Sequence, residues 1–361
     1  MRIGLVLQGD LDMLSGGFLY DRIVVRYLRE HGDDVEVFPL PWGSYPHCLR
    51  LNLSSHLAER LNRAEIDVLV QDELSHPSLF LANRHLKRRG AGPIISIVHH
   101  PRCMEARTAW KNLFYRQIER KYLRSVDGFI FNSRETRAAV TSLTGPGKPS
   151  VVAYPGGDRF GARMTEEAVA ARSDRDGLFR IIFLGNIIPR KGLHTLVAAL
   201  ACIDREGWHL SVVGNEEFED GYTGAVKQAI RGAGMESFIS FHGAISDGAL
   251  AGLLAQSHVL AVPSSYEGFG IVYLEAMGFG LPVIASDRAG GRELVKHGVN
   301  GFLVRPGDAA ALTRYLSMLM ADRKRLDAMS QAALRDFACH PTWAETGRRI
   351  QEFLHGVAPP E

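Results

Sequence analysis

The hydrophobic positions of this chain form short apolar runs that alternate with segments of helical periodicity. In the first half, these runs predict strands at 2–7, 34–38, 67–71, 94–98, 127–131 and 150–153. In the second half, they predict strands at 179–184, 209–213, 238–241, 258–262, 282–285 and near 302–304. Strands that alternate with helices are typical of α/β units around parallel sheets. We therefore expect an α/β fold with one such sheet in each half.

A stretch of turn residues separates the two halves. Tyr154-Pro155-Gly156-Gly157-Asp158 has the composition of a linker, and the polar stretch 161–177 follows it. We predict a Rossmann-like N-terminal domain over 1–155 and a Rossmann-like second domain over 156–340. Three closing helices are predicted at 309–320, 323–337 and 343–355.

Composition places the chain among soluble globular proteins. Its 361 residues are 46% hydrophobic and 23% charged, which suits two domains of ordinary size. Four scattered cysteines, without metal or disulfide spacing, favour a reducing cytosol. No apolar run is long enough to span a bilayer, and the start, Met1–Leu7, predicts a strand in place of a signal peptide.

The stretch from Ser264 to Glu275 carries the clearest candidate chemistry. A predicted strand precedes it, its loop contains two glycines, and a predicted helix follows. The free N–H groups and the dipole of a helix start attract anions. The carboxylates of Glu267 and Glu275 bracket the loop and suit sugar hydroxyls. Phosphate and hydroxyl recognition side by side predict a sugar nucleotide. A dinucleotide fingerprint is excluded, because Gly268 and Gly270 lack its third glycine.

These residues also resemble a known family. Glu267, seven intervening residues and Glu275 are similar to the E-x7-E motif of retaining glycosyltransferases of family 4, as is the longer string SSYEGFGIVYLEAMGFGLPVIASDRAGGRELV. The resemblance implies the GT-B architecture, in which two Rossmann-like domains face a central cleft. It also implies that a C-terminal helix within 341–361 returns to the N-terminal domain. The structural alternative is a capped surface helix with Glu275 on a solvated face.

The loop from Phe183 to Gly192 resembles the G-R-x-x-x-x-K-G loop of the same family. In that family two cations hold the nucleotide diphosphate, where they stabilise the charge that builds on the leaving group. Lys191 occupies the lysine position, Asn186 stands where the family has arginine, and Arg190 is expected to supply the missing charge. The alternative is a basic helix start on the surface, which the helix dipole disfavours.

The resemblance implies roles for residues at further strand ends. The catalytic residues that it implies are His99, Arg190, Lys191 and Glu267. The donor-binding residues that it implies are Gly16, Gly17, Asn186, Gly214, Gly243, Ala244, Ile245, Gly268, Phe269, Gly270, Ile271 and Glu275. The glycine loop that ends at Gly17 fits an anion site before a helix over 18–30, and the alternative is a plain turn that needs positive φ.

Two strands of the first half end in polar clusters, at 71–76 and at 97–102. Open α/β sheets place their ligands at such strand ends. The family has a histidine near the outer hydroxyls of the donor sugar, with which His99 aligns best and to which His100 is adjacent. The acceptor-side candidates are Asp72, His76 and His100, although residues 72–76 equally fit a capped helix start. The histidines lack the local spacing of metal ligands, so we expect no metal.

Charge is concentrated in one segment of the first half. Between Arg84 and Arg124 eleven cations face only Glu105 and Glu119, a net charge of +9 in a chain of +2. Within it Trp110, Leu113, Phe114 and Ile118 recur at helical spacing, and we expect them to pack this helix onto the sheet, with the cations as a solvated rim. The excess of positive charge predicts an anionic membrane surface, or a phosphorylated or lipid-diphosphate acceptor. Nucleic acid is disfavoured because the segment leads into the sugar-nucleotide site.

The sequence therefore predicts a metal-independent hexosyltransferase. It would move a hexose from a UDP- or GDP-sugar to a hydroxyl acceptor, such as a lipid or a lipid-linked or phosphorylated sugar in envelope glycan or glycolipid synthesis. The nucleoside-diphosphate sugar is a co-substrate, and no other cofactor is expected. We expect a cytoplasmic protein, peripheral at the inner membrane face. The rival functions are a phosphorylase or sugar-nucleotide epimerase of the same fold, and a non-catalytic sugar-nucleotide-binding protein, an alternative that the asparagine at position 186 leaves open.

Overall fold

The computed structural model describes residues 1–13, 15–53, 59–61, 63–105, 107–161, 164–174 and 177–358. Residues 162, 163, 175 and 176 of the predicted polar stretch, and 359–361 of the predicted last segment, lie outside the described residues. The chain divides into two compact units. The first comprises Met1–Gly156 and the segment that begins at Pro341, and the second is Gly157–His340.

The first unit contains a parallel sheet in the order β2-β1-β3-β4-β5-β6. Its strands are β1 (Arg2–Gln8), β2 (Asp34–Leu40), β3 (Val68–Asp72), β4 (Ile94–Val98), β5 (Gly128–Phe131) and β6 (Ser150–Val152). Strands β3, β4 and β5 are buried along their whole length, as expected where helices cover both faces of a parallel sheet. The strands predicted for the first half are confirmed to within two residues at each end.

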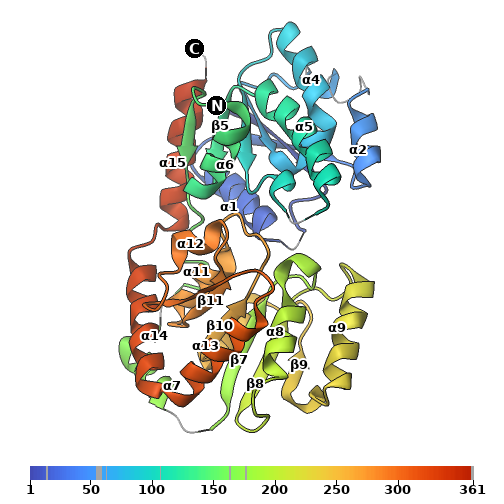
Figure 1. Ribbon diagram of the computed structural model, residues 1–361. Helices are drawn as coiled ribbons and strands as arrows, with labels where there is room; N and C mark the ends of the chain where they lie inside the picture. The colour runs from blue at the N-terminus through green and yellow to red at the C-terminus, as the bar shows by residue number, and fades with distance from the viewer. Residues whose placement is uncertain are drawn as a thin grey trace. The chain divides into compact units, whose positions relative to one another are not determined.

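Helices flank this sheet on both faces (Figure 1). They are α1 (Gly16–Glu30), α2 (Tyr45–Leu51), η1 (Glu73–Ser75), α4 (His76–Arg88), η2 (Arg102–Met104), α5 (Ala109–Ser125), α6 (Arg134–Thr144) and α15 (Trp343–Val357). A capping box between Thr342 and Glu345 starts α15. This helix packs against α1 and β6, and the rings of Trp343 and Tyr20 meet edge to face at 5.7 Å. The last helix of the chain thus belongs to the core of the first unit.

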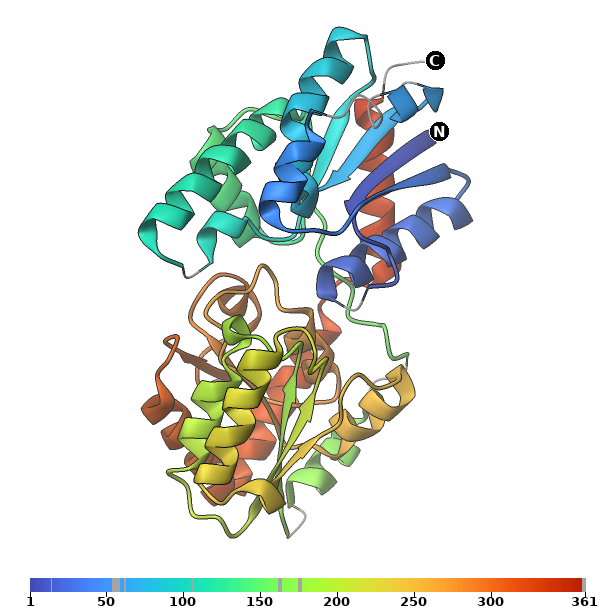
Figure 2. The ribbon, with the colours of Figure 1, turned by 90° about the vertical axis from the view of Figure 1, so that its right-hand side faces the viewer.

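The second unit contains a parallel sheet in the order β12-β11-β10-β7-β8-β9. Its strands are β7 (Phe179–Leu184), β8 (Trp208–Val213), β9 (Ile239–Phe241), β10 (Val259–Val262), β11 (Val283–Ser286) and β12 (Gly301–Val304). The predicted strands of the second half are likewise confirmed. Figure 2 shows helices in front of this sheet and behind it.

Helices precede, separate and follow the strands of the second unit along the chain. They are α7 (Glu166–Asp174), η3 (Pro189–Lys191), α8 (Leu193–Leu200), α9 (Asp220–Gly232), η4 (Glu236–Phe238), α10 (Asp247–Gln256), α11 (Ile271–Gly278), α12 (Gly290–Leu294), α13 (Ala309–Ala321) and α14 (Arg323–Ala338). Helix α7 lies within the predicted polar stretch and packs against α14. Its Arg172 donates to the carbonyls of Phe279 and Gly280 at 2.8 and 2.7 Å, which ties the stretch to the loop after α11.

Helix α5 corrects one prediction. Trp110, Leu113 and Phe114 are 68%, 59% and 46% exposed and do not pack the helix onto the sheet. The helix is instead buried through Tyr122 and Leu123 in its C-terminal half. Its N-terminal half presents an apolar face to solvent. Among the described helices none combines the length and apolarity needed to cross a membrane.

Candidate functional site

Each sheet brings predicted site residues to the edge at which its parallel strands end. In the first unit Gly16 and Gly17 follow β1, Asp72 ends β3 and His99 follows β4. In the second unit Asn186, Arg190 and Lys191 follow β7, Gly214 follows β8, Gly243, Ala244 and Ile245 follow β9, and the stretch from Glu267 to Ile271 follows β10. Such edges are the usual ligand sites of open α/β sheets.

In the second unit the predicted cations lie beside the carboxylate of Glu267. Its Oε1 lies 2.6 Å from Nζ of Lys191 and 3.2 Å from Nη1 of Arg190, and it accepts a 2.7 Å hydrogen bond from the hydroxyl of Ser264. Arg190 also donates to the carbonyl of Tyr266 at 2.7 Å. Three of the predicted catalytic residues therefore form one cluster.

Electrostatics fixes the charge of this cluster. Burial alone would raise the pKa of Glu267, but Lys191 and Arg190 outweigh it and lower this pKa to about 2. Burial lowers the pKa of Lys191, against the opposing effect of Glu267. The carboxylate is therefore ionised throughout the physiological range and lies beside two cations.

The loop before α11 needs glycine at position 270. Gly270 has φ of 89° at the N-cap of this helix. A side chain there would also collide with the ring of Tyr273, whose hydroxyl donates to the carbonyl of Val262 at 3.0 Å. This glycine therefore lets the chain turn sharply from β10 into α11 beside Glu267.

Asn186 begins the loop after β7 and is half-buried. Its carbonyl accepts from the amide of Ile188 at 2.9 Å, and the amide of Ile187 donates to the carbonyl of Asn215 at 3.0 Å. These bonds close the loop against the end of β8. The positive charge beside Glu267 comes from Arg190 and Lys191.

Glu275 is buried in α11 and has a cationic partner that sequence reasoning missed. Nη1 of Arg159 lies 2.7 Å from Oε1 of Glu275, while Nη2 lies 2.5 Å from Oδ1 of Asp247. Burial raises the pKa of Glu275, and Arg159 opposes that shift. The side chain is only 3% exposed, so the alternative of a solvated Glu275 is wrong. Arg159 lies 116 residues before Glu275 and 88 before Asp247, and no local pattern marks it.

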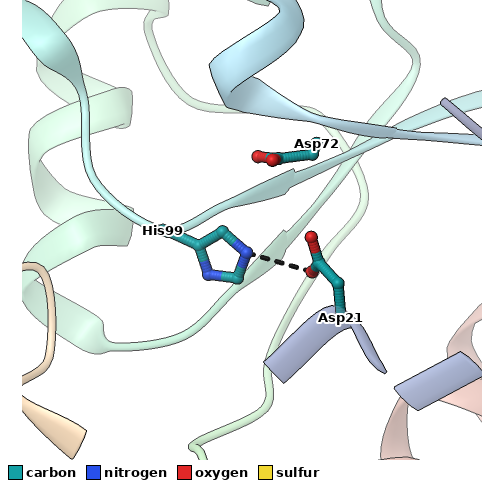
Figure 3. Close-up of side chains that lie close together, drawn as sticks. All are labelled: Asp21, Asp72 and His99. Carbon is teal, nitrogen blue, oxygen red and sulfur yellow. Dashed lines mark hydrogen bonds and ion pairs between the residues drawn. The ribbon is translucent and has the colours of Figure 1, made fainter. Parts of the chain in front are cut away.

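In the first unit His99 lies against two carboxylates from other elements (Figure 3). Nε2 of His99 is 3.0 Å from Oδ1 of Asp21, which is buried on α1. Asp72 at the end of β3 is also buried, and its Oδ1 accepts from the amide of Leu74 at 3.0 Å. Sequence reasoning selected His99 and Asp72 but missed Asp21, which reads as an ordinary helix residue.

The carboxylates decide the protonation of this cluster. Burial alone would lower the pKa of His99, but Asp21, Asp72 and Glu73 raise it to about 9. Burial raises the pKa of Asp72 to about 7, and the negative charge of Asp21 adds to this shift. The imidazole is therefore a cation near neutral pH, and Asp72 holds its proton up to that range.

The glycine loop meets His99 directly. Both Gly16 and Gly17 lie in the first turn of α1, and neither has positive φ, so the alternative of a positive-φ turn is wrong. A Cβ on Gly17 would lie 3.1 Å from Cδ2 of His99. Glycine at position 17 therefore leaves room for the imidazole.

Two clusters of the first unit have ligand atoms close enough to hold a metal ion. Asp21, Asp72 and His99 form one, and Glu73, His76 and Glu119 form the other. In the second cluster both oxygens of Glu119 already accept from backbone amides, one from Arg102 and one from Cys103 at 3.0 Å. Glu119 thus anchors the loop after His99, and because it is fully buried it does not offset the surface charge of its segment.

The other two acceptor-side candidates have partners of their own. His76 is 1% exposed; its Nδ1 is 3.0 Å from the carbonyl of Glu73 and its Nε2 is 3.0 Å from the hydroxyl of Tyr45. Both nitrogens of His76 are thus engaged inside the unit. His100 is half-buried, and its Nε2 lies 3.0 Å from Oε1 of Glu105.

Two family models match the chain. One, described as Glycosyltransferase Family 4, matches residues 20–159, and the other, described as Glycosyl transferases group 1, matches residues 165–336. The chain is 29% identical over 253 residues to the GDP-mannose-dependent alpha-(1-6)-phosphatidylinositol monomannoside mannosyltransferase of Mycobacterium tuberculosis. That match covers 67% of this chain and 65% of the relative. Glycogen synthase of the same species is 27% identical over 316 residues, 85% of this chain and 73% of the relative.

Solved structures share the fold over nearly the whole chain. Sucrose-phosphate synthase from Thermosynechococcus elongatus superposes with a TM-score of 0.84 at 19% identity, covering 99% of this chain and 98% of that one. Anabaena HepE in complex with UDP-glucose superposes with a TM-score of 0.77 at 22% identity, covering 98% and 100%. At these identities the likeness shows the fold alone.

Proposed function

This chain belongs to glycosyltransferase family 4 and has the GT-B architecture, and on that premise we propose that it transfers a hexose from a nucleoside-diphosphate sugar to a hydroxyl acceptor. The observation that carries the proposal is the cluster of Glu267 with Lys191 and Arg190 at the end of β10. Two fixed cations next to a glycine loop suit a leaving diphosphate. The relatives include enzymes whose names specify GDP-mannose, and a neighbour was solved with UDP-glucose, which supports a GDP- or UDP-hexose donor.

In the proposed reaction, negative charge grows on the diphosphate as the glycosidic bond breaks. Lys191 and Arg190 stabilise that charge from fixed positions, as oxyanion-hole donors do. All three donors to Glu267 address Oε1, so Oε2 is the oxygen we expect to face the hexose. Glu275 is assigned to the ribose hydroxyls, with Arg159 as the ion-pair partner of its carboxylate at 2.7 Å.

We infer retention of the anomeric configuration through a front-face route. A carboxylate with a pKa of about 2, neutralised by two cations, is a weak nucleophile. The departing diphosphate is then the group that takes the proton of the acceptor hydroxyl. Because Lys191 and Arg190 supply the positive charge, no metal ion is assigned a role in transfer.

The acceptor is assigned to the class of amphiphilic molecules at an anionic membrane surface. The exposed Trp110, Leu113 and Phe114 lie on one face of α5, close along the chain to His99. Lys121 and Arg124 are exposed on the same helix, and α4, which packs against it, exposes further cations. Apolar and cationic side chains together fit a bilayer with anionic headgroups, which attracts each nearby cation by about 1 kcal/mol. We place the protein in the cytoplasm, peripheral at the inner membrane face.

A donor and acceptor screen tests transfer. Purified protein is incubated with UDP- and GDP-hexoses, with and without lipid and sugar-phosphate acceptors, in EDTA and in Mg²⁺. We expect nucleoside diphosphate release only when an acceptor is present, equal rates in EDTA and Mg²⁺, and an α-linked product from an α-linked donor. Altered sugar without acceptor indicates an epimerase, sugar 1-phosphate formed with inorganic phosphate indicates a phosphorylase, and binding without turnover indicates a non-catalytic protein.

Co-sedimentation tests the membrane assignment. With vesicles of phosphatidylglycerol and phosphatidylcholine, binding is expected at low salt and should weaken as salt rises. Neutralising Arg88, Arg89, Lys111 and Arg120 together should abolish binding, and replacing Trp110, Leu113 and Phe114 by serine should weaken it at every salt concentration. Phe218→Ser is the matched control, because Phe218 is 49% exposed in the second unit. Wild-type protein that stays in the supernatant at low salt would leave a soluble acceptor as the better assignment.

A further inference from the structure

We propose that Asp21 is a positioning residue that fixes the imidazole of His99, so that Nδ1–H is the group that meets the substrate. This inference rests on the proposed transfer and assigns a residue that the motifs of the sequence do not mark. Asp21 belongs to α1, and His99 follows β4, 78 residues later. Their bond joins the glycine-loop helix to the strand end that carries the histidine.

The imidazole of His99 is restrained from several sides. Oδ1 of Asp21 accepts at 3.0 Å from Nε2, and the ring of Tyr20 meets the imidazole edge to face at 5.2 Å. Gly17 lies against Cδ2. The carbonyl of His99 accepts from Nδ2 of Asn132 at 2.9 Å, which holds the backbone after β4. A ring restrained in this way has one orientation.

Asp21 itself has no other hydrogen-bonded task in the described part of the chain. Its side chain is fully buried, and Oδ2 makes no hydrogen bond. Oδ2 points toward Asp72, while Nδ1 of His99 points away from both carboxylates (Figure 3). Within the described residues Nδ1 makes no hydrogen bond. A buried carboxylate with only one hydrogen-bonded oxygen is costly unless its charge has a partner, and the imidazolium is that partner.

Three carboxyl groups face the imidazole: Asp21 from α1, Asp72 from β3 and Glu73 from η1. Together they raise the pKa of His99 to about 9, against its burial. The pKa of Asp72 is about 7 and that of Glu73 about 8, so both carboxyl groups hold much of their proton near neutral pH. Of the three, Asp21 is the one whose oxygen lies within hydrogen-bond distance of Nε2, at 3.0 Å, so it is the acceptor that holds the proton there.

A histidine held in this state donates and does not accept. With Nε2–H bound to Asp21, the imidazolium presents Nδ1–H to an oxygen of the substrate, either a hydroxyl or a phosphoryl oxygen. The bond from Nε2 to Asp21 and the raised pKa of His99 both favour donation to the substrate over a role as general base. His99 thus offers the first unit a positively charged donor at the end of β4.

The test combines a direct titration of His99 with kinetics. ¹⁵N-histidine-labelled full-length protein is titrated by NMR, and comparison with His99→Gln assigns the His99 signals among the 14 histidines. We expect His99 to titrate near pH 9 in the wild type, and at least one unit lower in Asp21→Asn. Asp34→Asn is the matched control, because Asp34 is an exposed aspartate at the opposite edge of the sheet. It should change neither the titration nor turnover.

The kinetics separate positioning from folding. In Asp21→Asn we expect kcat to fall by roughly 10²-fold, the size of effect that misplacing a reacting group produces. The donor KM should change little, and the alkaline limb of the pH profile should shift to lower pH with the His99 pKa. Wild-type titration of His99 at pH 6.5 or below overturns the proposal without needing any variant. So does an Asp21→Asn enzyme with unchanged kcat and pH profile. A protein that transfers no sugar, yet titrates as expected, overturns the transferase proposal and leaves the Asp21–His99 assignment intact.

Discussion

The Glu267 cluster of the second unit and the His99 cluster of the first unit occupy equivalent strand ends but have opposite electrostatics. In the second unit two cations surround one carboxylate and lower its pKa to about 2. In the first unit several carboxyl groups surround one imidazole, and the pKa values of Asp72 and Glu73 rise to about 7 and 8. The first arrangement holds fixed charge across the physiological range, whereas the second holds protons. One sheet edge therefore suits a leaving diphosphate, and the other suits directional donation to a substrate oxygen.

Lys191→Ala should have the largest effect, because it removes fixed charge from the second unit. Loss of one preorganised donor to a developing oxyanion typically costs about 10²–10³ in kcat. Arg190 and Ser264 still bind Glu267, so we expect the variant to fold, as circular dichroism can check. Lys324→Ala is the control at an exposed lysine, where a change within about 0.5 kcal/mol is usual. Wild-type kinetics in Lys191→Ala would contradict the proposed role of Lys191 in stabilising the leaving diphosphate.

The next largest effect should be on the pH dependence of stability, which we expect to differ between the two clusters. Because the pKa values in the first unit are raised, these groups contribute their full stability to the folded state at low pH. The contribution of Asp72 and Glu73 declines as pH rises above about 4, and that of His99 declines between about pH 6.5 and 9. The lowered pKa of Glu267 contributes stability that is present above about 4.5 and is lost toward pH 2.

At about 1.4 kcal/mol for each unit of pKa, each of these groups should cost the first unit a few kcal/mol, lost progressively between about pH 4 and pH 9. Hydrogen exchange of the β3 and β4 amides should report that loss, while the β10 amides should weaken only in acid. Asp72→Asn, which mimics the protonated acid, should reduce the part of this loss that falls between about pH 4 and pH 7. Equal pH responses of the two sheets would show that the opposite electrostatics of the two clusters do not affect the stability of the units.

Glu275→Gln and Glu267→Gln should differ in kind. Loss of a charged hydrogen bond costs about 1.5–3 kcal/mol, so Glu275→Gln should weaken donor affinity roughly ten- to a hundredfold with kcat little changed. Glu267→Gln should lower kcat as well, because it disturbs the cations at the diphosphate. Calorimetric binding of nucleoside diphosphate and steady-state kinetics measure the two effects, with Glu206→Gln as an exposed control. Unchanged donor affinity and rate in both variants would sink the assignment of the pair.

Asn186→Arg should have the smallest effect. The family's arginine position lies in a half-buried loop tied to the end of β8, and Arg190 and Lys191 already supply charge beside Glu267. We expect nucleotide affinity to be preserved or to rise a fewfold. A large loss of affinity, with the fold intact, would mean that Asn186 has a specific contact of its own.

The sequence by itself determined the order of strands and helices, the two parallel sheets and the neighbourhood of Glu267. Alternating apolar runs specify strands locally. A strand, a glycine loop and a helix within the twenty residues 259–278 bring their side chains together whatever the rest of the chain does. For the same reason Lys191 and Arg190 were found from their place at the end of β7 and the motif they resemble. Their charges act on a carboxylate at the end of β10, and β10 pairs with β7.

Only the tertiary structure decided the partners of His99 and Glu275. Asp21 and Arg159 reach them across 78 and 116 residues, and periodicity cannot rank one buried aspartate or one linker arginine above the others. The tertiary structure also decided which face of α5 is buried. Helical spacing indicates that Trp110, Leu113 and Phe114 share one face, but it does not say whether that face packs on the sheet. Glu119 and Tyr122 lie on the buried face of α5, where Glu119 accepts a hydrogen bond from the loop after His99. The stripe lies on the other face of the helix and is therefore exposed.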